Sequence, residues 1–166
     1  PTSPKGHKSK TQPHGSAKSP LRPLSLSLTA GASYVARTAA VNPNQAKEIL
    51  IEAIEHDGFA HVDFLTQCPT WNKDAKQYVP YVDVQDSDDY EFDVTDRQEA
   101  AEMMYETESA LYEGTVLTGR FYKDDRPSYT EEKQAIGEMP EEPVVEQYFD
   151  DDTEWKRSYD LLDRHK

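Results

Sequence analysis

The clearest pattern of apolar and polar positions predicts a helix in the second quarter of the chain. Apolar side chains recur at intervals of three and four residues from Ala46 to Ile54, which is the spacing of one buried helix face. Asn42 is a favourable N-cap and Pro43 suits the first helical position. Gly58 supplies a left-handed residue that stops a helix. The pattern therefore predicts an amphipathic helix between Asn42 and Gly58.

Apolar runs at residues 34–37 and 59–65 flank this helix and predict two strands. A strand, a helix and a second strand within about 30 residues are typical of a βαβ unit. The two strands should therefore be parallel and covered on both faces. This places His61 and Asp63 inside the fold or at a face edge. For His61, a core histidine with satisfied hydrogen bonds is favoured over a metal ligand.

Three further elements follow from local signals. Leucines predict a short helix over 23–30 that ends at Gly31. A second long helix is expected to begin at a capping box, 95–98, and to end at Gly114. The apolar run 116–122 predicts one more strand. Together with the βαβ unit, these elements indicate an α/β fold.

The first part of the chain, residues 1–23, is rich in proline and lysine and predicts a loop. The first acidic residue of the whole chain is Glu48. Two interpretations stay open for this basic segment. It is either a disordered tail or a loop that covers an anionic ligand such as a diphosphate, a role that suits lysines and backbone N–H groups.

Two acidic regions are expected to be solvated. Residues 73–94 form an aromatic and Asp-rich loop, and the run 86–89 lacks the spaced oxygens, central glycine and terminal glutamate of a calcium loop. From about residue 130 the chain is dominated by Glu, Asp and Pro, which predicts a mostly disordered acidic tail. A short amphipathic helix near Trp155 is expected to dock on a partner.

Composition narrows the possible environments. The 166 residues carry a formal net charge of −14, which argues against nucleic acid and against an anionic membrane as partner. The acidic bias favours a high-salt cytoplasm, although ordinary proteins also show it. No run of about 18 apolar residues indicates a transmembrane helix. One cysteine excludes an internal disulfide framework and indicates a reducing, cytoplasmic setting.

The only cysteine, Cys68, follows the apolar run 59–65. In open α/β folds, ligands bind in the crevice beyond the carboxyl ends of the strands. A single thiol cannot close a metal site alone, so Cys68 is either a lone buried thiol or a ligand whose partners lie outside this chain. The sequence contains no nucleophile–base pair, glycine-rich phosphate loop or two-histidine metal motif.

At this point several segments together carry a resemblance to a known family: 31–38, 42–58, 59–65, 68–72, 1–4, 8–11, 116–122 and 125–129. Taken together in their order along the chain, these segments resemble the β subunit of 2-oxoacid:ferredoxin oxidoreductases, and the resemblance runs from Pro1 to about Tyr129. The acidic bias makes a haloarchaeal version the expected one. The resemblance implies the C-terminal part of a thiamine-diphosphate-binding fold with a parallel sheet, followed by an acidic, partly disordered tail. The implied divisions are 1–72 for that domain, 73–130 for a C-terminal segment and 131–166 for the tail.

The resemblance also implies an activity. Enzymes of this family oxidatively decarboxylate a 2-oxoacid with coenzyme A and pass electrons to ferredoxin, using thiamine diphosphate, Mg²⁺ and a [4Fe–4S] cluster. Cys68 matches the position of the fourth cluster ligand, and Thr2 matches a position near thiamine diphosphate. Thiolate ligation suits iron–sulfur clusters, whose sulfurs come from cysteines. The implied partners are the α subunit, ferredoxin, coenzyme A and the 2-oxoacid.

The family's Gly-Asp-Gly-Asp stretch, its Mg²⁺-holding Asn and its other three cysteines are not in this chain. The chain also begins without Met, so it resembles the C-terminal portion of a longer subunit and is expected to be inactive alone. Clipping of an initiator Met is the alternative for that start. Pyruvate, 2-oxoglutarate and branched 2-oxoacids all stay open as substrates. The alternative function is a non-catalytic acidic interaction module in which Cys68 is a structural buried thiol.

Overall fold

The computed structural model describes residues 5–66, 81–110 and 115–137. The chain divides into two compact units, Pro1–Arg126 and Pro127–Lys166. The first unit contains all four strands and three helices of the described part, and the second contains one described helix.

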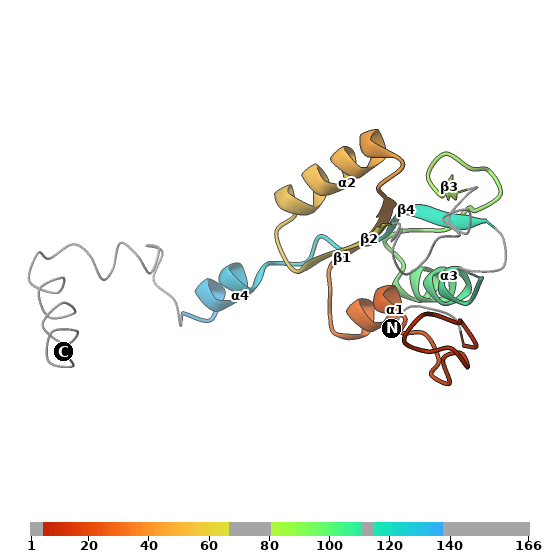
Figure 1. Cartoon of the computed structure of the whole chain (residues 1–166). Coiled ribbons are helices and arrows are strands. Elements are labelled where there is room, and N and C mark those ends of the chain that lie inside the picture. The colour runs from red at the N-terminus through yellow and green to blue at the C-terminus, as the bar shows by residue number, and fades with distance from the viewer. Residues whose placement is uncertain (1–4, 67–80, 111–114, 138–166) are drawn as a thin grey trace, which may run out of the picture. The chain divides into compact units, whose positions relative to one another are not determined.

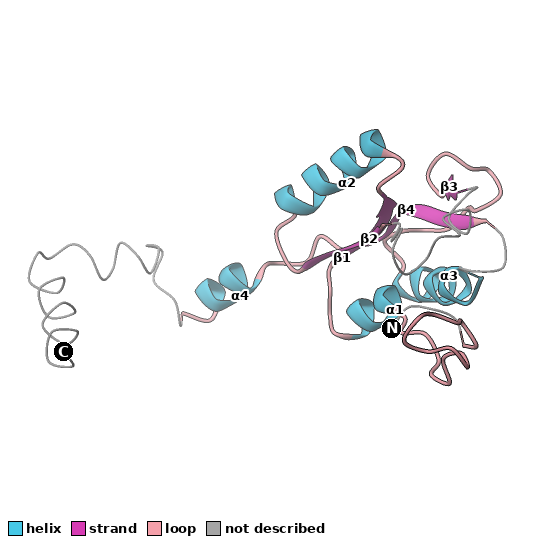
Figure 2. Ribbon diagram, viewed as in Figure 1, coloured by secondary structure: helices cyan, strands magenta, loops and turns pink. Residues whose placement is uncertain are grey.

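A four-stranded sheet in the order β2-β1-β4-β3 forms the centre of the first unit (Figure 2). Its strands are β1 (Tyr34–Ala39), β2 (Ala60–Leu65), β3 (Tyr81–Asp83) and β4 (Val116–Lys123). β1 and β2 are parallel, with Tyr34 opposite Ala60 and Ala39 opposite Leu65. The sequence prediction of a parallel βαβ unit is therefore confirmed.

The strand β4 makes the sheet mixed rather than fully parallel. It runs antiparallel to β1 and parallel to β3, so two of the three pairings are parallel. Added antiparallel strands are common on otherwise parallel sheets. The pairing of β1 with β4 shifts register between Val35 and Ala36. The α/β class predicted from the sequence is confirmed, and the sheet that was predicted as parallel is mostly parallel.

Helices cover both faces of this sheet (Figure 1). Alternate side chains of β1 point to opposite faces. Val35 packs in a cluster with residues of α1 (Pro23–Thr29) and α3 (Arg97–Ala110). Ala36 packs with residues of α2 (Pro43–Glu55) on the other face. All six residues of β1 are buried, because β1 lies between two other strands and between the two helix layers.

The predicted helix after Asn42 is present as α2, but it ends earlier than expected. Asn42 caps it, since its side chain accepts a hydrogen bond from the amide of Gln45 at 3.4 Å. The last helical residue is Glu55, and the following His56 has an extended backbone. The prediction of Gly58 as the stop residue is wrong, because this glycine lies in the turn before β2 with φ +150°.

The start of α3 also differs from its prediction. Asp96, not Thr95, caps the helix by accepting from the amides of Gln98 at 2.7 Å and Glu99 at 3.1 Å. The Thr95 hydroxyl instead donates to Asp93 at 2.7 Å. The predicted helix over 23–30 is confirmed as α1, and Gly31 follows it with φ +95°.

Two elements lie where only loop or tail was expected. β3 interrupts the segment that was predicted as loop, and it pairs with β4 from Tyr81 to Asp83. The helix α4 (Tyr129–Ala135) begins the region that was predicted as mostly disordered. A capping box between Ser128 and Glu131 starts it. The predicted helix near Trp155 lies outside the described residues.

β2 is less covered than its apolar sequence predicted. Within the described part of the chain it is an edge strand, paired only with β1. All its side chains are partly or well exposed, and Phe64 is 40% exposed. The prediction that both faces of this strand are covered is therefore wrong for the described residues.

Candidate functional site

A buried ion pair joins the carboxyl halves of β1 and β2. Arg37 and Asp63 stand directly opposite each other in the parallel register. The Nε of Arg37 donates to a carboxylate oxygen of Asp63 at 2.8 Å. The arginine is 0% exposed. Because a buried charge needs a partner of opposite sign, this pair fixes the relative position of the two strands.

A second carboxylate extends the pair to the helix layer. Glu108 of α3 is buried and lies 3.8 Å from Nη2 of Arg37. Its oxygens also accept hydrogen bonds from the amides of Leu24 at 2.7 Å and Ser25 at 3.2 Å. α1 has no side-chain cap at Arg22. Glu108 therefore supplies the acceptor that the first amides of α1 need.

Two nitrogens of this polar cluster have no partner among the described residues. They are Nη1 of Arg37 and Nε2 of His61, both buried. His61 stands opposite Val35, so its side chain is on the same face of the sheet as Arg37. The sequence interpretation of His61 as a satisfied core histidine is wrong for the described part of the chain. A buried polar atom without a hydrogen-bond partner costs about 1–3 kcal/mol, so both nitrogens call for a hydrogen-bond partner.

A second polar cluster lies on the opposite face, under the first turn of α2. The side chain of Gln45 is buried and reaches three strands. It accepts from Thr38 at 3.1 Å and donates to Asp83 at 2.5 Å and to Thr118 at 3.0 Å. Each polar atom of Gln45 is satisfied, so this cluster locks α2 to β1, β3 and β4.

A tyrosine–glutamate–arginine chain continues along this face. The hydroxyl of Tyr34 donates to Glu52 at 3.0 Å, and Nη1 of Arg120 contacts both oxygens of Glu52 at 3.1 and 3.2 Å. Burial, and then the negative charge of Glu52, raise the pKa of the Tyr34 phenol above its usual range. The phenol therefore stays protonated and acts as a hydrogen-bond donor.

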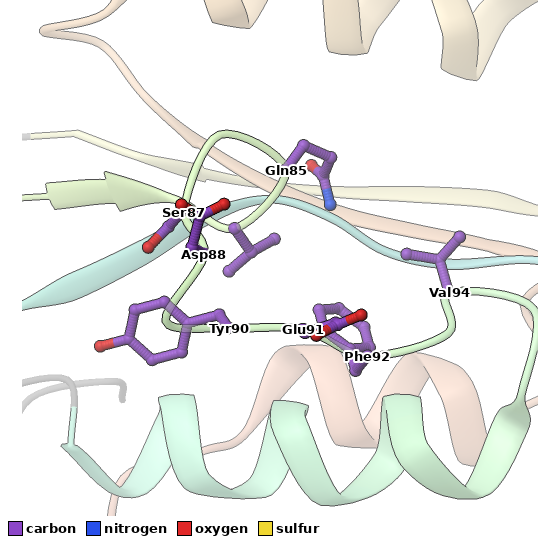
Figure 3. A pocket seen from close by; sticks show the side chains of 8 residues that line it. Gln85, Ser87, Asp88, Tyr90, Glu91, Phe92 and Val94 are labelled. Carbon is purple, nitrogen blue, oxygen red and sulfur yellow. The ribbon is translucent and has the colours of Figure 1, made fainter.

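The loop after β3 lines an open pocket of about 550 Å³ (Figure 3). Its lining comes from residues 84–94 and combines the carboxylates of Asp88 and Glu91 with the rings of Tyr90 and Phe92. Phe92 also stacks on Phe121 of β4 at a centroid distance of 6.4 Å. The described residues contain no group of three His, Cys, Asp or Glu side chains that could hold a metal ion. The acidic run 86–89 therefore forms no such group here.

The two site residues predicted from the sequence, Thr2 and Cys68, lie outside the described residues. Thr66, one residue after β2, and Tyr81 are the described residues on either side of Cys68. Their roles therefore stay predictions. None of the described helices is long and apolar enough to cross a membrane.

Sequence reasoning missed the polar residues that the fold brings together. Arg37 was assigned only to a buried strand, and Glu108 only to a helix. A charged residue within an apolar strand was the available signal, because arginine is almost never fully buried without a partner. The sequence does not show that Glu108 is a partner of Arg37, because Glu108 is 71 residues further along the chain.

Comparisons with known proteins relate part of the chain to one group of enzymes. Over 70 residues it is 44% identical to the 2-oxoglutarate synthase subunit KorB of Archaeoglobus fulgidus, covering 42% of this chain and 26% of that subunit. Over 72 residues it is 39% identical to the 2-oxoacid:ferredoxin oxidoreductase subunit beta of Saccharolobus solfataricus, covering 43% and 24%. It is 40% identical over 72 residues to the 2-oxoglutarate oxidoreductase subunit KorB of Mycobacterium tuberculosis, covering 43% and 19%. No protein-family model matches the chain.

A solved structure shares the fold over most of the chain. It is a 2-oxoglutarate:ferredoxin oxidoreductase from Magnetococcus marinus with 2-oxoglutarate, coenzyme A and succinyl-CoA bound. The TM-score is 0.67 at 28% identity, and the match covers 87% of this chain and 49% of that one. The chain thus spans about a quarter of the curated relatives' length and about half of the solved chain. Over part of its length, the chain is homologous to β subunits of 2-oxoacid:ferredoxin oxidoreductases.

Proposed function

We propose that this chain is part of the β subunit of an enzyme that oxidatively decarboxylates a 2-oxoacid with coenzyme A and reduces ferredoxin. The observation that carries the proposal is the 35–44% identity to curated subunits of such enzymes from archaea and a bacterium. The shared fold with a 2-oxoglutarate:ferredoxin oxidoreductase supports it. Because several of these relatives are named for 2-oxoglutarate, this is the first substrate to test.

Within this proposal, Cys68 is the fourth ligand of a [4Fe–4S] cluster, and Thr2 lies near thiamine diphosphate. The cluster would carry electrons, and thiamine diphosphate with Mg²⁺ would carry the decarboxylation. The described residues act on these sites indirectly. The buried pair of Arg37 with Asp63 holds the end of β2, and Cys68 follows Asp63 by five residues in the sequence.

The surface of α2 supports a role as one part of a larger assembly. Ile54 is 82% exposed, and Leu50 and Ile51 are also well exposed on the same side of the helix. The opposite side of α2, with Ala46 and Ile49, is buried. A surface helix normally has one apolar stripe. Two stripes on one helix suit a helix that packs against further protein, such as the rest of the β subunit or the α subunit.

The test uses the complete β subunit purified with its α subunit. We expect 2-oxoglutarate-dependent reduction of ferredoxin that requires coenzyme A. Cys68→Ser should weaken the broad iron–sulfur absorbance at about 400 nm, because a cysteine sulfur ligates the iron. It should also lower ferredoxin reduction. Thr66→Ser, a change at an exposed neighbouring position, is the matched control and should leave both unchanged.

Two results would count against the proposal in different ways. If the complex oxidises no 2-oxoacid with any of the three substrate classes, the assigned activity is wrong. If the complex is active but Cys68→Ser keeps its iron content and its absorbance, only the ligand assignment is wrong. In that case Cys68 is a structural thiol.

A further inference from the structure

The loop of residues 84–94, which lines the open pocket, is fixed to β4 at both of its ends. The amide of Val84 donates to the carbonyl of Thr118 at 2.9 Å. The carbonyl of Val94 accepts from the amide of Lys123 at 2.9 Å. Because each end of the loop is hydrogen-bonded to the same strand, the pocket has a preformed frame, as small-molecule sites usually have.

One side of the pocket is aromatic and rests on the core of the first unit. Tyr90 and Phe92 are partly buried and pack against the cluster of buried residues that includes Val84 and Met104. Phe92 also stacks on Phe121 of β4. The core therefore holds both rings in place, and both still line the pocket (Figure 3).

Two carboxylates without partners line the same pocket. Asp88 and Glu91 are exposed. Among the described residues, neither carboxylate forms an ion pair or accepts a hydrogen bond. Asp93 of the same loop does not line the pocket, and its carboxylate accepts from the amide and the hydroxyl of Thr95 at 2.8 and 2.7 Å. The carboxylate that shapes the loop and the carboxylates that line the pocket are thus different residues.

The charge around the pocket has a single sign. Residues 84–94 contain five acidic residues and no Lys, Arg or His. A cleft lined by one sign of charge raises the local concentration of ions of the opposite sign. Coenzyme A and the 2-oxoacid of the proposed function carry phosphate or carboxylate groups, so this pocket repels them. Its charge suits a cation.

We propose that this pocket binds a small organic cation, an alkylammonium or alkylguanidinium compound. Asp88 and Glu91 pair with its cationic groups. The rings of Tyr90 and Phe92 pack on its carbon chain, and an aromatic face also attracts a cation directly. The volume of about 550 Å³ lies within the usual range of small-molecule sites, about 300–1,000 Å³. A metal ion fits less well, since the described part of the chain has no group of three side chains that could hold one.

The test measures the binding of putrescine and agmatine, by isothermal titration, to the complete β subunit purified with its α subunit. Both amines should bind, whereas butanediol, an uncharged analogue of putrescine, should not. Asp88→Asn together with Glu91→Gln should weaken the binding of both amines about tenfold or more. Salt should weaken binding to the unchanged complex as well.

A second double variant is the matched control. Asp86→Asn together with Asp89→Asn removes the same charge from the same loop, at exposed residues that do not line the pocket. It should change the affinity for the amines by less than about twofold, because water and salt screen these charges. Tyr90→Leu keeps an apolar side chain but removes the ring, and it should weaken binding about two- to fivefold.

Three results would overturn the proposal. The first is an absence of amine binding at millimolar concentration. The second is an equal loss in the two double variants, which would mean that the charge of the whole loop attracts amines without a specific pocket. The third is tighter binding of a lysine-containing peptide than of either amine, which would identify a protein side chain as the ligand. Binding is measured without turnover, so a complex that oxidises no 2-oxoacid would refute only the proposed function.

Discussion

Removal of the Arg37 guanidinium should destabilise the first unit more than removal of any surface charge. Arg37→Met keeps most of the length of the side chain but leaves Asp63 and Glu108 without their cation. The side chains of these carboxylates are 17% and 2% exposed. Breaking a buried ion pair by removing one partner costs about 3–5 kcal/mol, because the remaining charge stays buried. Glu108 keeps its hydrogen bonds to the start of α1, so we expect the lower end, about 3 kcal/mol.

Arg120→Met is the matched control. Arg120 also pairs with a carboxylate, but its side chain is 28% exposed and that of Glu52 is 44% exposed. Exposed pairs contribute about 0–1 kcal/mol, because water and salt screen them. The loss of stability in Arg37→Lys should fall between the losses in Arg37→Met and Arg120→Met, since lysine keeps the charge but lacks the planar guanidinium that reaches two carboxylates.

Urea unfolding of the 166-residue chain, followed by circular dichroism, measures this difference. With a typical urea dependence of about 1–3 kcal/mol per molar, a loss of 3 kcal/mol lowers the midpoint by about 1–3 M. Arg120→Met should lower it by less than about 1 M. If Arg37→Met and Arg120→Met shift the midpoint equally, the buried network does not hold β1, β2 and the helix layer together as described.

Two more predictions concern the other face of the sheet. Gly119→Ala should cost more stability than Gly31→Ala, although both glycines have positive φ. A Cβ at Gly119 would stand 2.7 Å from Asp83, whereas a Cβ at Gly31 would have nothing within 4 Å. Equal urea midpoints for the two variants would contradict this. The raised pKa of Tyr34 contributes stability that is fully present below the ordinary tyrosine value of 10.0 and is lost as the pH rises above it. Tyr34→Phe should therefore lose less stability than the unchanged chain between about pH 9 and pH 11, and parallel losses in urea midpoints would refute the assignment.

Elements with strong local signals could be predicted from the sequence. The helix after Asn42 and the parallel strands on either side of it depend on spacing and capping within about 30 residues. Helix boundaries were less secure. Thr95 looked like a good cap, but its hydroxyl is already bonded to Asp93, so Asp96 caps α3 instead. Local competition between neighbouring polar side chains decided this, and residue type alone does not reveal it.

Elements that depend on distant partners could not be predicted. β3 has only three residues, and it is a strand because β4 pairs with it from more than 30 residues away. Gln45 is a polar residue on the buried face of α2. In the fold it satisfies hydroxyls and a carboxylate from three strands. The sequence shows where a polar residue interrupts an apolar face, but the partner is set by topology.

The open side of β2 connects the fold to the proposed function. Within the described residues, β2 has an unpaired edge, and two buried nitrogens beside it, of Arg37 and His61, have no hydrogen-bond partner. Unpaired strand edges and unsatisfied buried polar atoms are both unfavourable, so folded proteins normally cover the first and pair the second. The exposed apolar residues of α2 also favour contact with further protein that would cover them. If the chain is part of a β subunit, the rest of that subunit would supply the missing strand partner and hydrogen-bond partners. The polar cluster of Arg37 would then lie inside the sheet rather than at its edge.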